Sequence, residues 1–395
     1  MIRLDPAGWR RRQGMARLLD ALGAEEGLTR YVGGAIRDDL LGIDVNDVDL
    51  ATRIEPDEVV RRLEQARIKA VPTGIDHGTI TAVSGGHPYE ITTLRRDVTT
   101  DGRRATVAFT SDWKEDAARR DFTINALLAD PVTGELFDFF GGLDDLAERR
   151  VRFIGEPLQR IAEDHLRILR FFRFHARFGA GEPDPAGVAA CAARANDLMA
   201  LSRERIADEL TKLLGLPDPV PTLRIMLDRS ILKPVLPEIK PEAIGRLADL
   251  IAAEVAAGIE PDAIRRIAAL LPADPAVATD VAARLRLSNK AKKRLVSAAE
   301  AGGGVDARAM AYRLGRAEAA DRLLLADRPD EAREIAAYTP PRLPLGGGDL
   351  IARGLAKGPA VARTLRKIEQ RWIDNGFPTG AGLEAIIAEE VSRAE

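Results

Sequence analysis

The sequence changes character at Gly141-Gly142, and this change constrains the fold more than any other feature. Between residues 28 and 140, short segments rich in β-branched residues alternate with helical patterns. After the two glycines, long helical patterns rich in alanine and leucine take over, and strand patterns almost disappear. The sequence therefore predicts an α+β protein, with a mixed α/β domain at the N-terminus followed by an all-α region.

Local patterns place the expected elements of the N-terminal part. Tyr31-Val32, Gly33-Gly34 and the helical run AIRDDLLG form a strand–turn–helix pattern. Residues 95–114, which include TTDGRR, are polar and are expected to form a loop. Further expected helices are residues 9–26 and 56–67, and further expected strands are residues 47–52, 78–83 and 89–94.

Composition excludes several classes of protein. A length of 395 residues suggests two to four domains, and a net charge of −3 means that any basic surface for nucleic acid must be local. The sequence contains no run of eighteen apolar residues, so it predicts no membrane span. The basic start MIRLDPAGWRRRQG is not followed by an apolar run, so it does not suggest a signal peptide. Cys191 is the single cysteine, which excludes a disulfide framework and favours a reducing, cytoplasmic location.

Two carboxylates form the sharpest local motif. Asp47 and Asp49 are two apart on an expected strand, so they share one face, where they can hold divalent cations for an in-line phosphoryl displacement. An isolated Asp-x-Asp pair is more often a solvated strand end or a helix cap. Here Gly33-Gly34 precedes it at a turn whose backbone can approach a phosphate, with Arg37 on the following helix. Glu90 on a second strand is either a third carboxylate or an exposed strand residue.

An arginine-rich segment follows the α/β domain. Residues 149–178 contain eight arginines and three acidic residues, and Arg160, Arg167, Arg170 and Arg173 recur at helical spacing. The phenylalanines at positions 171, 172, 174 and 178 predict a buried helix beside a cleft, in which unpaired arginines need phosphate as a partner. A solvated face with intrahelical ion pairs is the alternative.

Asp164 and Arg167 are one helical turn apart in this segment. A carboxylate and a guanidinium together match the amino group and ring acceptor of cytosine or adenine, and mismatch guanine and uracil. The structural alternative is that Asp164 pairs with Arg160 or His165 and stabilises the helix. The four histidines are dispersed, and none is expected to bind a metal.

Four sequence blocks together resemble one enzyme family. The run YVGGAIRDDLLGIDVNDVDLAT resembles the nucleotidyltransferase signature of class II CCA-adding enzymes and their relatives, the bacterial poly(A) polymerases. ARRDFTINAL (118–127), EDHLR (163–167) and LSRERIADELTKLL (201–214) resemble the family's next motif, its nucleotide-selecting helix and the helix that braces it. The resemblance implies a seahorse-like architecture with a catalytic head (1–141), a nucleotide-selecting neck (142–215), a body (216–337) and a tRNA-binding tail (338–395).

The resemblance also implies roles for individual residues. Asp47 and Asp49 would be Mg²⁺ ligands, with Glu90 as a further catalytic candidate, and Asp164 and Arg167 would act as a protein template for the base. Arg119 is either another contact or a surface residue that pairs with Glu115 or Asp116. Asp121 and Asn125 would hold the ribose side or the local structure. The full set of expected nucleotide-binding residues is Gly34, Arg37, Arg120, Asp164, Arg167, Arg170 and Arg173.

The implied activity is template-independent addition of C, C and A to the 3′ end of tRNA from CTP and ATP, with Mg²⁺ and without an obligate protein partner or a membrane. Alternatives are a poly(A) polymerase, an enzyme that adds only CC or A, and a non-catalytic RNA-binding descendant. AVPTGIDHGTITAV (70–83) lacks the Gly-Arg/Lys-Arg/Lys-Phe run of the poly(A) polymerases, and the expected loop with Asp101, Arg103 and Arg104 favours full CCA addition. Basic residues at 288–295 and 350–372 are candidates for tRNA contacts, although runs like 288–295 are more often solvated helix faces.

Overall fold

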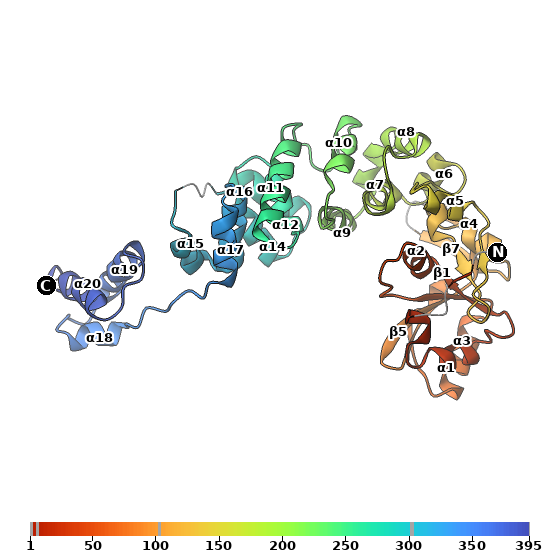
Figure 1. The fold of residues 1–395 in the computed structure, drawn as a ribbon, viewed down its shortest axis with the longest axis horizontal. Coiled ribbons are helices and arrows are strands. Elements are labelled where there is room, and N and C mark those ends of the chain that lie inside the picture. Colours follow the sequence, from red (N-terminus) through yellow and green to blue (C-terminus); the bar gives the residue numbers. More distant parts are fainter. Residues whose placement is uncertain (1–2, 5–7, 102–103, 301–303, 395) are drawn as a thin grey trace. The chain divides into compact units, whose positions relative to one another are not determined.

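A computed structural model describes residues 3–4, 8–101, 104–300 and 304–394 of the chain. The chain folds into two compact units, Met1–Pro237 and Glu238–Glu395 (Figure 1). The first unit contains all the strands among the described residues, and the second is helical. The expected α+β class is therefore confirmed. The division into head, neck, body and tail is finer than these two units and stays a prediction.

A seven-stranded sheet forms the centre of the N-terminal part, with the strand order β3-β4-β5-β2-β1-β8-β9. Strands β2 and β5 run parallel, whereas the other neighbouring pairs are antiparallel. This parallel register places Asp49 opposite Glu90. The strands are β1 Thr29–Val32, β2 Asp49–Thr52, β3 Lys69–Gly74, β4 Thr79–Ser84, β5 His87–Thr93, β8 Leu128–Ala129 and β9 Leu136–Phe137.

The expected elements around this sheet are confirmed in part. Strands β4 and β5 and helix α3 match the predicted segments, but the helix predicted over residues 9–26 is wrong in extent. Residues 8–11 form a 3₁₀ helix (η1), and α1 begins only after Gly14, whose φ of +84° interrupts the helical path. Strand β2 begins at Asp49, so Asp47 lies in the segment that leads into the strand. The helices are α1 Met15–Ala21, α2 Gly34–Leu40, α3 Pro56–Gln65 and α4 Trp113–Ala118.

The loop predicted over residues 95–114 is wrong for most of its length. Strands β6 (Arg95–Asp101) and β7 (Arg104–Phe109) pair antiparallel in a separate two-stranded sheet. The threonines and valines of this segment favour an extended backbone. Arg103 and the side chains of Asp101 and Arg104 lie outside the described part of the chain.

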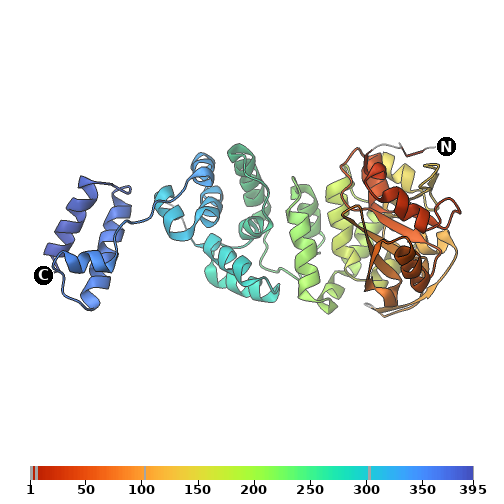
Figure 2. The same ribbon diagram turned by 90° about the horizontal axis from the view of Figure 1, so that it is seen from below.

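After β9, the described residues of the first unit form helices, as the change of pattern predicts. Helix α5 begins at Gly142, where a Cβ atom would lie 2.4 Å from the Thr123 carbonyl oxygen, so only glycine permits this approach. Phe122 contacts Phe174 at a ring distance of 5.1 Å and thereby joins the helices to the sheet domain. Figure 2 shows these helices, coloured yellow-green, beside the sheet. The helices are α5 Gly142–Ala147, α6 Pro157–Glu163, α7 Arg167–Phe178, α8 Pro185–Ala193, α9 Arg203–Leu214 and α10 Val220–Asp228.

The second unit consists of helices α11 to α20. Buried ion pairs join four of them, because Glu254 binds Arg265 and Arg266 while Asp321 binds Arg265 and Arg294. The helices are α11 Ala243–Ala257, α12 Ala263–Leu270, α13 Pro275–Arg284, α14 Asn289–Ala299, α15 Ala307–Leu314, α16 Arg316–Leu325, α17 Pro329–Ala337, α18 Gly347–Ala352, α19 Pro359–Asp374 and α20 Ala381–Ser392.

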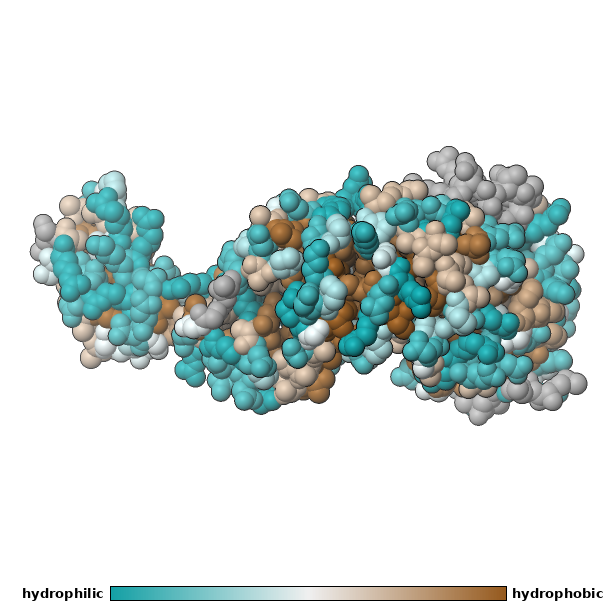
Figure 3. All heavy atoms as spheres, turned by 90° about the horizontal axis from the view of Figure 1, so that it is seen from above, coloured by the Kyte–Doolittle hydropathy of each residue, from teal (hydrophilic) through white to brown (hydrophobic). Residues whose placement is uncertain are grey.

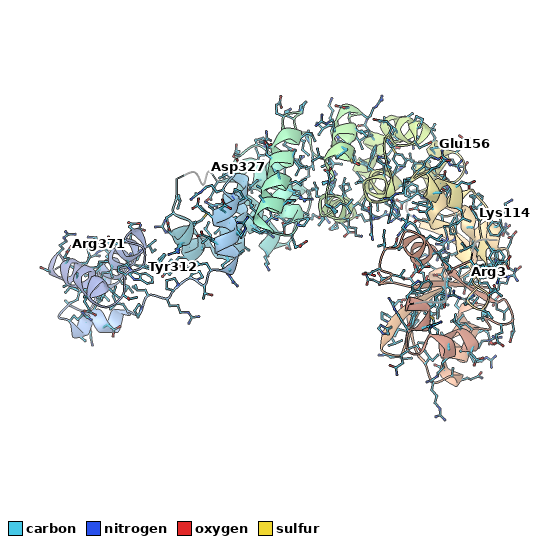
Figure 4. All side chains as sticks on the ribbon, viewed as in Figure 1. Arg3, Lys114, Glu156, Tyr312, Asp327 and Arg371 are labelled. Atoms are coloured by element: carbon cyan, nitrogen blue, oxygen red, sulfur yellow. The ribbon has the colours of Figure 1, made fainter. Side chains whose placement is uncertain are left out.

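The last three helices pack on α15 around a core of their own. Tyr312 of α15 donates a hydrogen bond of 2.6 Å to Glu369 of α19 and packs edge-on against Trp372 (Figure 4). The surface over these C-terminal helices, at the left of Figure 3, is mostly hydrophilic in that view. None of the described helices combines the length and the apolar character needed to cross a membrane.

Candidate active site

A pocket of about 450 Å³ opens in the first unit between the sheet and helices α7 and α9. Seven of the ten predicted site residues line it, namely Gly34, Arg37, Asp49, Arg120, Asp164, Arg167 and Arg170. Asp47, Glu90 and Arg173 are not among the lining residues. Sequence reasoning did not assign Leu166, Phe174 or Arg205 to the site, although all three line the pocket.

Of the three predicted catalytic carboxylates, Asp49 lines this pocket. Asp49 and Glu90 are register partners on β2 and β5, and their side chains point to the same face of the sheet. The Asp49 carboxylate remains open to solvent, but the pocket walls remove much of its hydration. This desolvation, with repulsion from Glu90 and Asp47, raises the pKa of Asp49 to about 6 against the opposing effect of Arg120. Asp49 thus lies within electrostatic range of both Asp47 and Glu90.

The turn before α2 brings backbone into the pocket. Gly33 has a φ of +73°, and a Cβ there would lie 3.4 Å from both Arg120 Nη1 and the Asn125 carbonyl oxygen. Arg37 is buried and donates hydrogen bonds to Asn125 and, at 2.8 Å, to Asp38. Burial lowers the pKa of Arg37, partly offset by Asp38. These bonds hold the guanidinium at the pocket wall as a fixed positive charge.

A buried carboxylate holds two neighbouring arginines. Asp116 accepts a bond of 2.8 Å from Arg119 Nε and one of 3.4 Å from Arg120 Nη2. Arg119 thus pairs with Asp116, one of the two partners expected for it, but it also lines the pocket. Burial lowers the pKa of Arg119 to about 10. Among the described residues, the buried Arg120 Nε has no hydrogen-bond partner, so this guanidinium keeps a donor unused.

The segment 163–167 is not one helix, which corrects the predicted one-turn spacing. Helix α6 ends at Glu163, Asp164 is extended with φ −149° and ψ 107°, and α7 begins at Arg167. The Asp164 carboxylate accepts the Leu166 N–H at 3.1 Å and Arg205 Nη2 at 2.8 Å. The Leu166 N–H and Arg205, rather than the expected Arg160 or His165, donate these two hydrogen bonds. The helix break turns Asp164 into the pocket, where Arg205 of α9 holds it.

The arginines of α7 are paired, which corrects the expectation that they need phosphate as a partner. Arg170 donates two bonds to Asp121, at 2.9 and 2.6 Å. Arg173 donates one of 2.6 Å to the buried Glu209 of α9 and lies outside the pocket lining. Burial alone would raise the pKa of Asp121, but Arg170 and Asn125 outweigh it and lower the pKa. The partners are distant in sequence, so a local count of charges misses them.

Arg167 is also engaged within the protein. Its Nη1 donates to Glu163 at 2.6 Å and to the Arg160 carbonyl at 2.8 Å, and its Nη2 donates to the Arg119 carbonyl at 3.0 Å. Glu163 bonds Arg160 as well, at 2.8 Å. The Arg160–Glu163 pair lies within α6, as the alternative interpretation expects, whereas the Arg167–Glu163 pair spans the break between α6 and α7. These contacts fix the Arg167 guanidinium at the pocket wall and leave part of its donor set for another group.

The donor set fits a divalent cation that shares its coordination with a ligand. The described residues contain no cluster of three or more His, Cys, Asp or Glu side chains that forms a ready-made metal cage. Magnesium sites with nucleotides typically use one or two carboxylates, with phosphate and water oxygens in the other positions. The repulsion that raises the pKa of Asp49 is the electrostatic condition that a bound cation relieves.

Comparisons with known proteins show which family the chain resembles. A family model described as the poly A polymerase head domain matches residues 29–152, and one described as a probable RNA and SrmB-binding site of polymerase A matches residues 182–252. The CCA-adding enzyme of Lacticaseibacillus paracasei is 32% identical over 384 residues, which cover 92% of this chain and 92% of that protein. The chain belongs to the family of CCA-adding enzymes. The resemblance carried by the four motifs is thus confirmed, and nucleotidyltransferases of this kind use a divalent metal.

Other members of the family match over different lengths. The mitochondrial CCA tRNA nucleotidyltransferase 1 of Homo sapiens is 45% identical over 205 residues, which cover 51% of this chain and 47% of that protein. The chain therefore spans about half the length of this relative. The Bacillus stearothermophilus CCA-adding enzyme in complex with CTP has a TM-score of 0.75 at 25% identity, covering 96% of this chain and 98% of that chain. The Thermotoga maritima enzyme complexed with tRNA, at 23% identity and a TM-score of 0.71, covers 96% of this chain and 94% of that one and shares the fold.

Proposed function

We propose that this protein adds C, C and A to the 3′ end of tRNA from CTP and ATP without a nucleic-acid template. The observation that carries the proposal is that Asp49 and Asp164 line one pocket of about 450 Å³. That volume is within the range of small-molecule sites. The pocket unites a carboxylate suited to metal-assisted phosphoryl transfer with a fixed acceptor suited to a base. Family membership supports the same activity, as does the CTP complex of the Bacillus stearothermophilus relative.

The transfer step joins the tRNA 3′ oxygen to the α-phosphorus of the nucleotide and breaks the bond to the leaving pyrophosphate. Asp47 and Asp49 would hold Mg²⁺, which supplies charge stabilisation at the reacting phosphate when bound. Glu90 adds a third carboxylate next to Asp49. The backbone at Gly33-Gly34 and the guanidinium groups of Arg37 and Arg120 also line the pocket and offer N–H donors and positive charge to the triphosphate.

Base selection falls to Asp164 and Arg167. Each Asp164 oxygen accepts one bond from the protein, and a carboxylate oxygen has room for a further donor. The amino group that cytosine and adenine share is such a donor. Arg205 holds the carboxylate in place, and Arg167 offers its remaining N–H groups to ring acceptors. Guanine and uracil would place a carbonyl opposite Asp164 and leave buried polar groups unpaired.

The second unit supplies the proposed tRNA grip. Arg363, Arg366 and Lys367 are exposed on α19, and the described residues include no ion-pair partner for them. Three unpaired cations on one helix are suited to RNA phosphates. The basic run at 288–295 is a weaker candidate, because Lys293 pairs with Glu318 at 3.4 Å.

The buried reduced Cys191 supports a cytoplasmic location.

Incubation of the full chain with tRNA that lacks its CCA end, together with labelled CTP or ATP and Mg²⁺, tests the proposal. We expect CTP to be incorporated first, and ATP only once the CC step has occurred. Incorporation of ATP into long tails would instead identify a poly(A) polymerase. This outcome is tested because the family model that matches residues 29–152 is described as a poly A polymerase head domain. Binding of tRNA without any incorporation would identify a non-catalytic RNA-binding protein.

A further inference from the structure

The segment between α2 and β2 carries Asp47 but has few anchors of its own. It spans residues 41–48, and its backbone N–H bonds to α2 end at Ile43, which donates to the Asp38 carbonyl. Val45 and Val48 are buried, whereas Asp47 is exposed. The two valines fix the path of the segment only through non-directional packing. A further, directional contact is therefore needed to fix the orientation of the peptide groups just before Asp47.

Arg12 supplies that contact. Its Nη1 donates a hydrogen bond of 2.8 Å to the Asn46 carbonyl, and its Nη2 donates one to the Val45 carbonyl. Within the described part of the chain, these are the hydrogen bonds that reach the backbone of residues 44–47. The two N–H groups of a guanidinium form a rigid fork. The fork binds two consecutive carbonyls and so fixes two peptide planes directly before Asp47.

The segment that carries Arg12 is itself firmly placed at its first end. Trp9 of η1 donates a bond of 2.8 Å from Nε1 to Asp39 of α2. Its ring also packs edge-on against Tyr31 of β1, with the centroids 4.7 Å apart. The Arg12 N–H bonds back to the Trp9 carbonyl at 3.3 Å. Residues 9–12 are therefore tied both to the helix that precedes the Asp47 segment and to the central strand.

The other end of the segment is held against the β4–β5 turn. The Ser84 hydroxyl donates a bond of 2.8 Å to the Gly14 carbonyl. A Cβ atom on Gly85, whose φ is +58°, would lie 1.8 Å from the Gln13 carbonyl oxygen, so the two backbones are in direct contact. Glu90 lies on β5, the strand that follows this turn. Residues 9–14 thus bridge the segment before Asp47 and the hairpin that leads to Glu90.

We propose that Arg12 is a positioning residue that holds Asp47 in place for the catalytic metal. The inference rests on the proposed function, because it takes Asp47 as a metal ligand. Arg12 is not among the residues that line the pocket; it acts on the backbone that presents the carboxylate. It also precedes residues 29–152, so it lies outside the matched head domain. Loss of a residue that orients a metal ligand typically weakens metal binding about 10- to 100-fold.

The affinity of the full chain for Mn²⁺, measured by electron paramagnetic resonance in the absence of nucleotide and tRNA, tests this role. We compare Arg12→Gln with Arg11→Gln, which removes the same charge from the neighbouring, exposed arginine of η1. Arg12→Lys is a third variant, since it keeps the charge but cannot bind both carbonyls as a fork. Thermal midpoints and tRNA affinity, measured on all three variants, report whether the fold is intact.

We expect Arg12→Gln to weaken Mn²⁺ binding about tenfold or more, Arg12→Lys to fall between it and wild type, and Arg11→Gln to match wild type. The metal concentration for half-maximal CTP incorporation should shift in parallel, with the rate largely recovered at saturating metal. Equal Mn²⁺ affinity in Arg12→Gln and Arg11→Gln would overturn the inference, as would a rate loss that metal does not restore. If wild type incorporates no nucleotide, the proposed function fails, while Mn²⁺ binding still reports on Arg12. Should Arg12→Gln not fold, Arg12→Lys decides by the same comparison.

Discussion

Asp49 and Glu90 lie opposite each other on the parallel strands β2 and β5, and their mutual repulsion helps to raise the pKa of Asp49 to about 6. Forty residues separate them in the sequence, yet the sheet register brings both side chains to the same face. Two carboxylates held together in this way destabilise the metal-free protein and favour a bound cation. We propose that these carboxylates lower the stability of the metal-free protein and raise its affinity for a metal, and both effects can be measured.

Replacement of Asp49 by asparagine should abolish both C and A addition while leaving tRNA binding intact. It should also raise the thermal midpoint of the metal-free protein at pH 8 by about 2 °C, a value kept small because the carboxylate is open to solvent. The sign follows from the raised pKa. Ionised Asp49 costs the folded state stability above pH 6, and this cost falls as the pH drops towards the unfolded-state pKa near 3.8. Calorimetry of Asp49→Asn and wild type at pH 8 and pH 4 measures this difference in thermal midpoint. A midpoint of Asp49→Asn below that of wild type at pH 8 would contradict the account.

Asp164→Ala should change which nucleotide is used rather than whether transfer occurs. Each unmatched buried group costs about 1–3 kcal/mol, so the preference for CTP and ATP over UTP and GTP should fall roughly ten- to hundredfold. Arg205→Ala should change the preference in the same direction, because Arg205 holds the Asp164 carboxylate. Arg203→Ala on the same helix is the matched control. The test compares the incorporation rates of CTP, ATP, UTP and GTP at equal folded fraction. An unchanged nucleotide preference in Asp164→Ala would show that this residue has only a structural role.

Arg173→Ala should destabilise the first unit without raising the KM for CTP. Arg173 bonds the buried Glu209 at 2.6 Å, and breaking such a pair leaves a buried charge at a cost of about 3 kcal/mol. Burial raises the pKa of the Cys191 thiol and keeps it unreactive in the folded state. The rate of Cys191 labelling in urea thus reports unfolding of the first unit. A raised KM for CTP with an unchanged labelling profile would instead show that Arg173 contributes to nucleotide binding.

The exposed cations of α19 should set much of the salt dependence of tRNA binding. Replacing Arg363, Arg366 and Lys367 by glutamine leaves the buried tail core untouched, unlike deletion of residues 338–395, which would uncover Tyr312. If each residue contacts one phosphate, the slope of log affinity against log salt falls by about 0.9 per residue, taking the value for duplex DNA. Fluorescence anisotropy with labelled tRNA measures the slope. An unchanged slope in the triple variant would exclude this face of α19 as a tRNA contact.

Sequence reasoning could predict features that depend on neighbouring residues. The change of pattern at Gly141-Gly142 predicted the α+β division, and the motifs predicted seven residues that line one pocket. The two-stranded sheet at 95–109 was missed because its polar residues were given more weight than its threonines and valines. The break at Asp164 was missed because EDHLR contains no glycine or proline, while Arg160 to Arg173 keep a helical spacing across it.

Partners distant in sequence were the main source of error at the site. The charge excess of residues 149–178 suggested arginines that need phosphate, yet Arg170 and Arg173 find Asp121 and Glu209 in other elements. The same limit applies to Arg205 and Arg12, whose contacts lie 41 and 34 residues away. Only the packing of α9 on α7 and of η1 on the sheet reveals these pairs.

Sequencing of the 3′ ends made by wild-type protein tests the central claim most directly. The substrate is tRNA that lacks its CCA end, supplied with all four nucleotides and Mg²⁺, with Asp49→Asn as the catalytically inactive control. The account predicts that products gain C, C and A in that order and then stop, and that the control gains nothing. Products with long A tails, with G or U at these positions, or with equal extension by Asp49→Asn would contradict it.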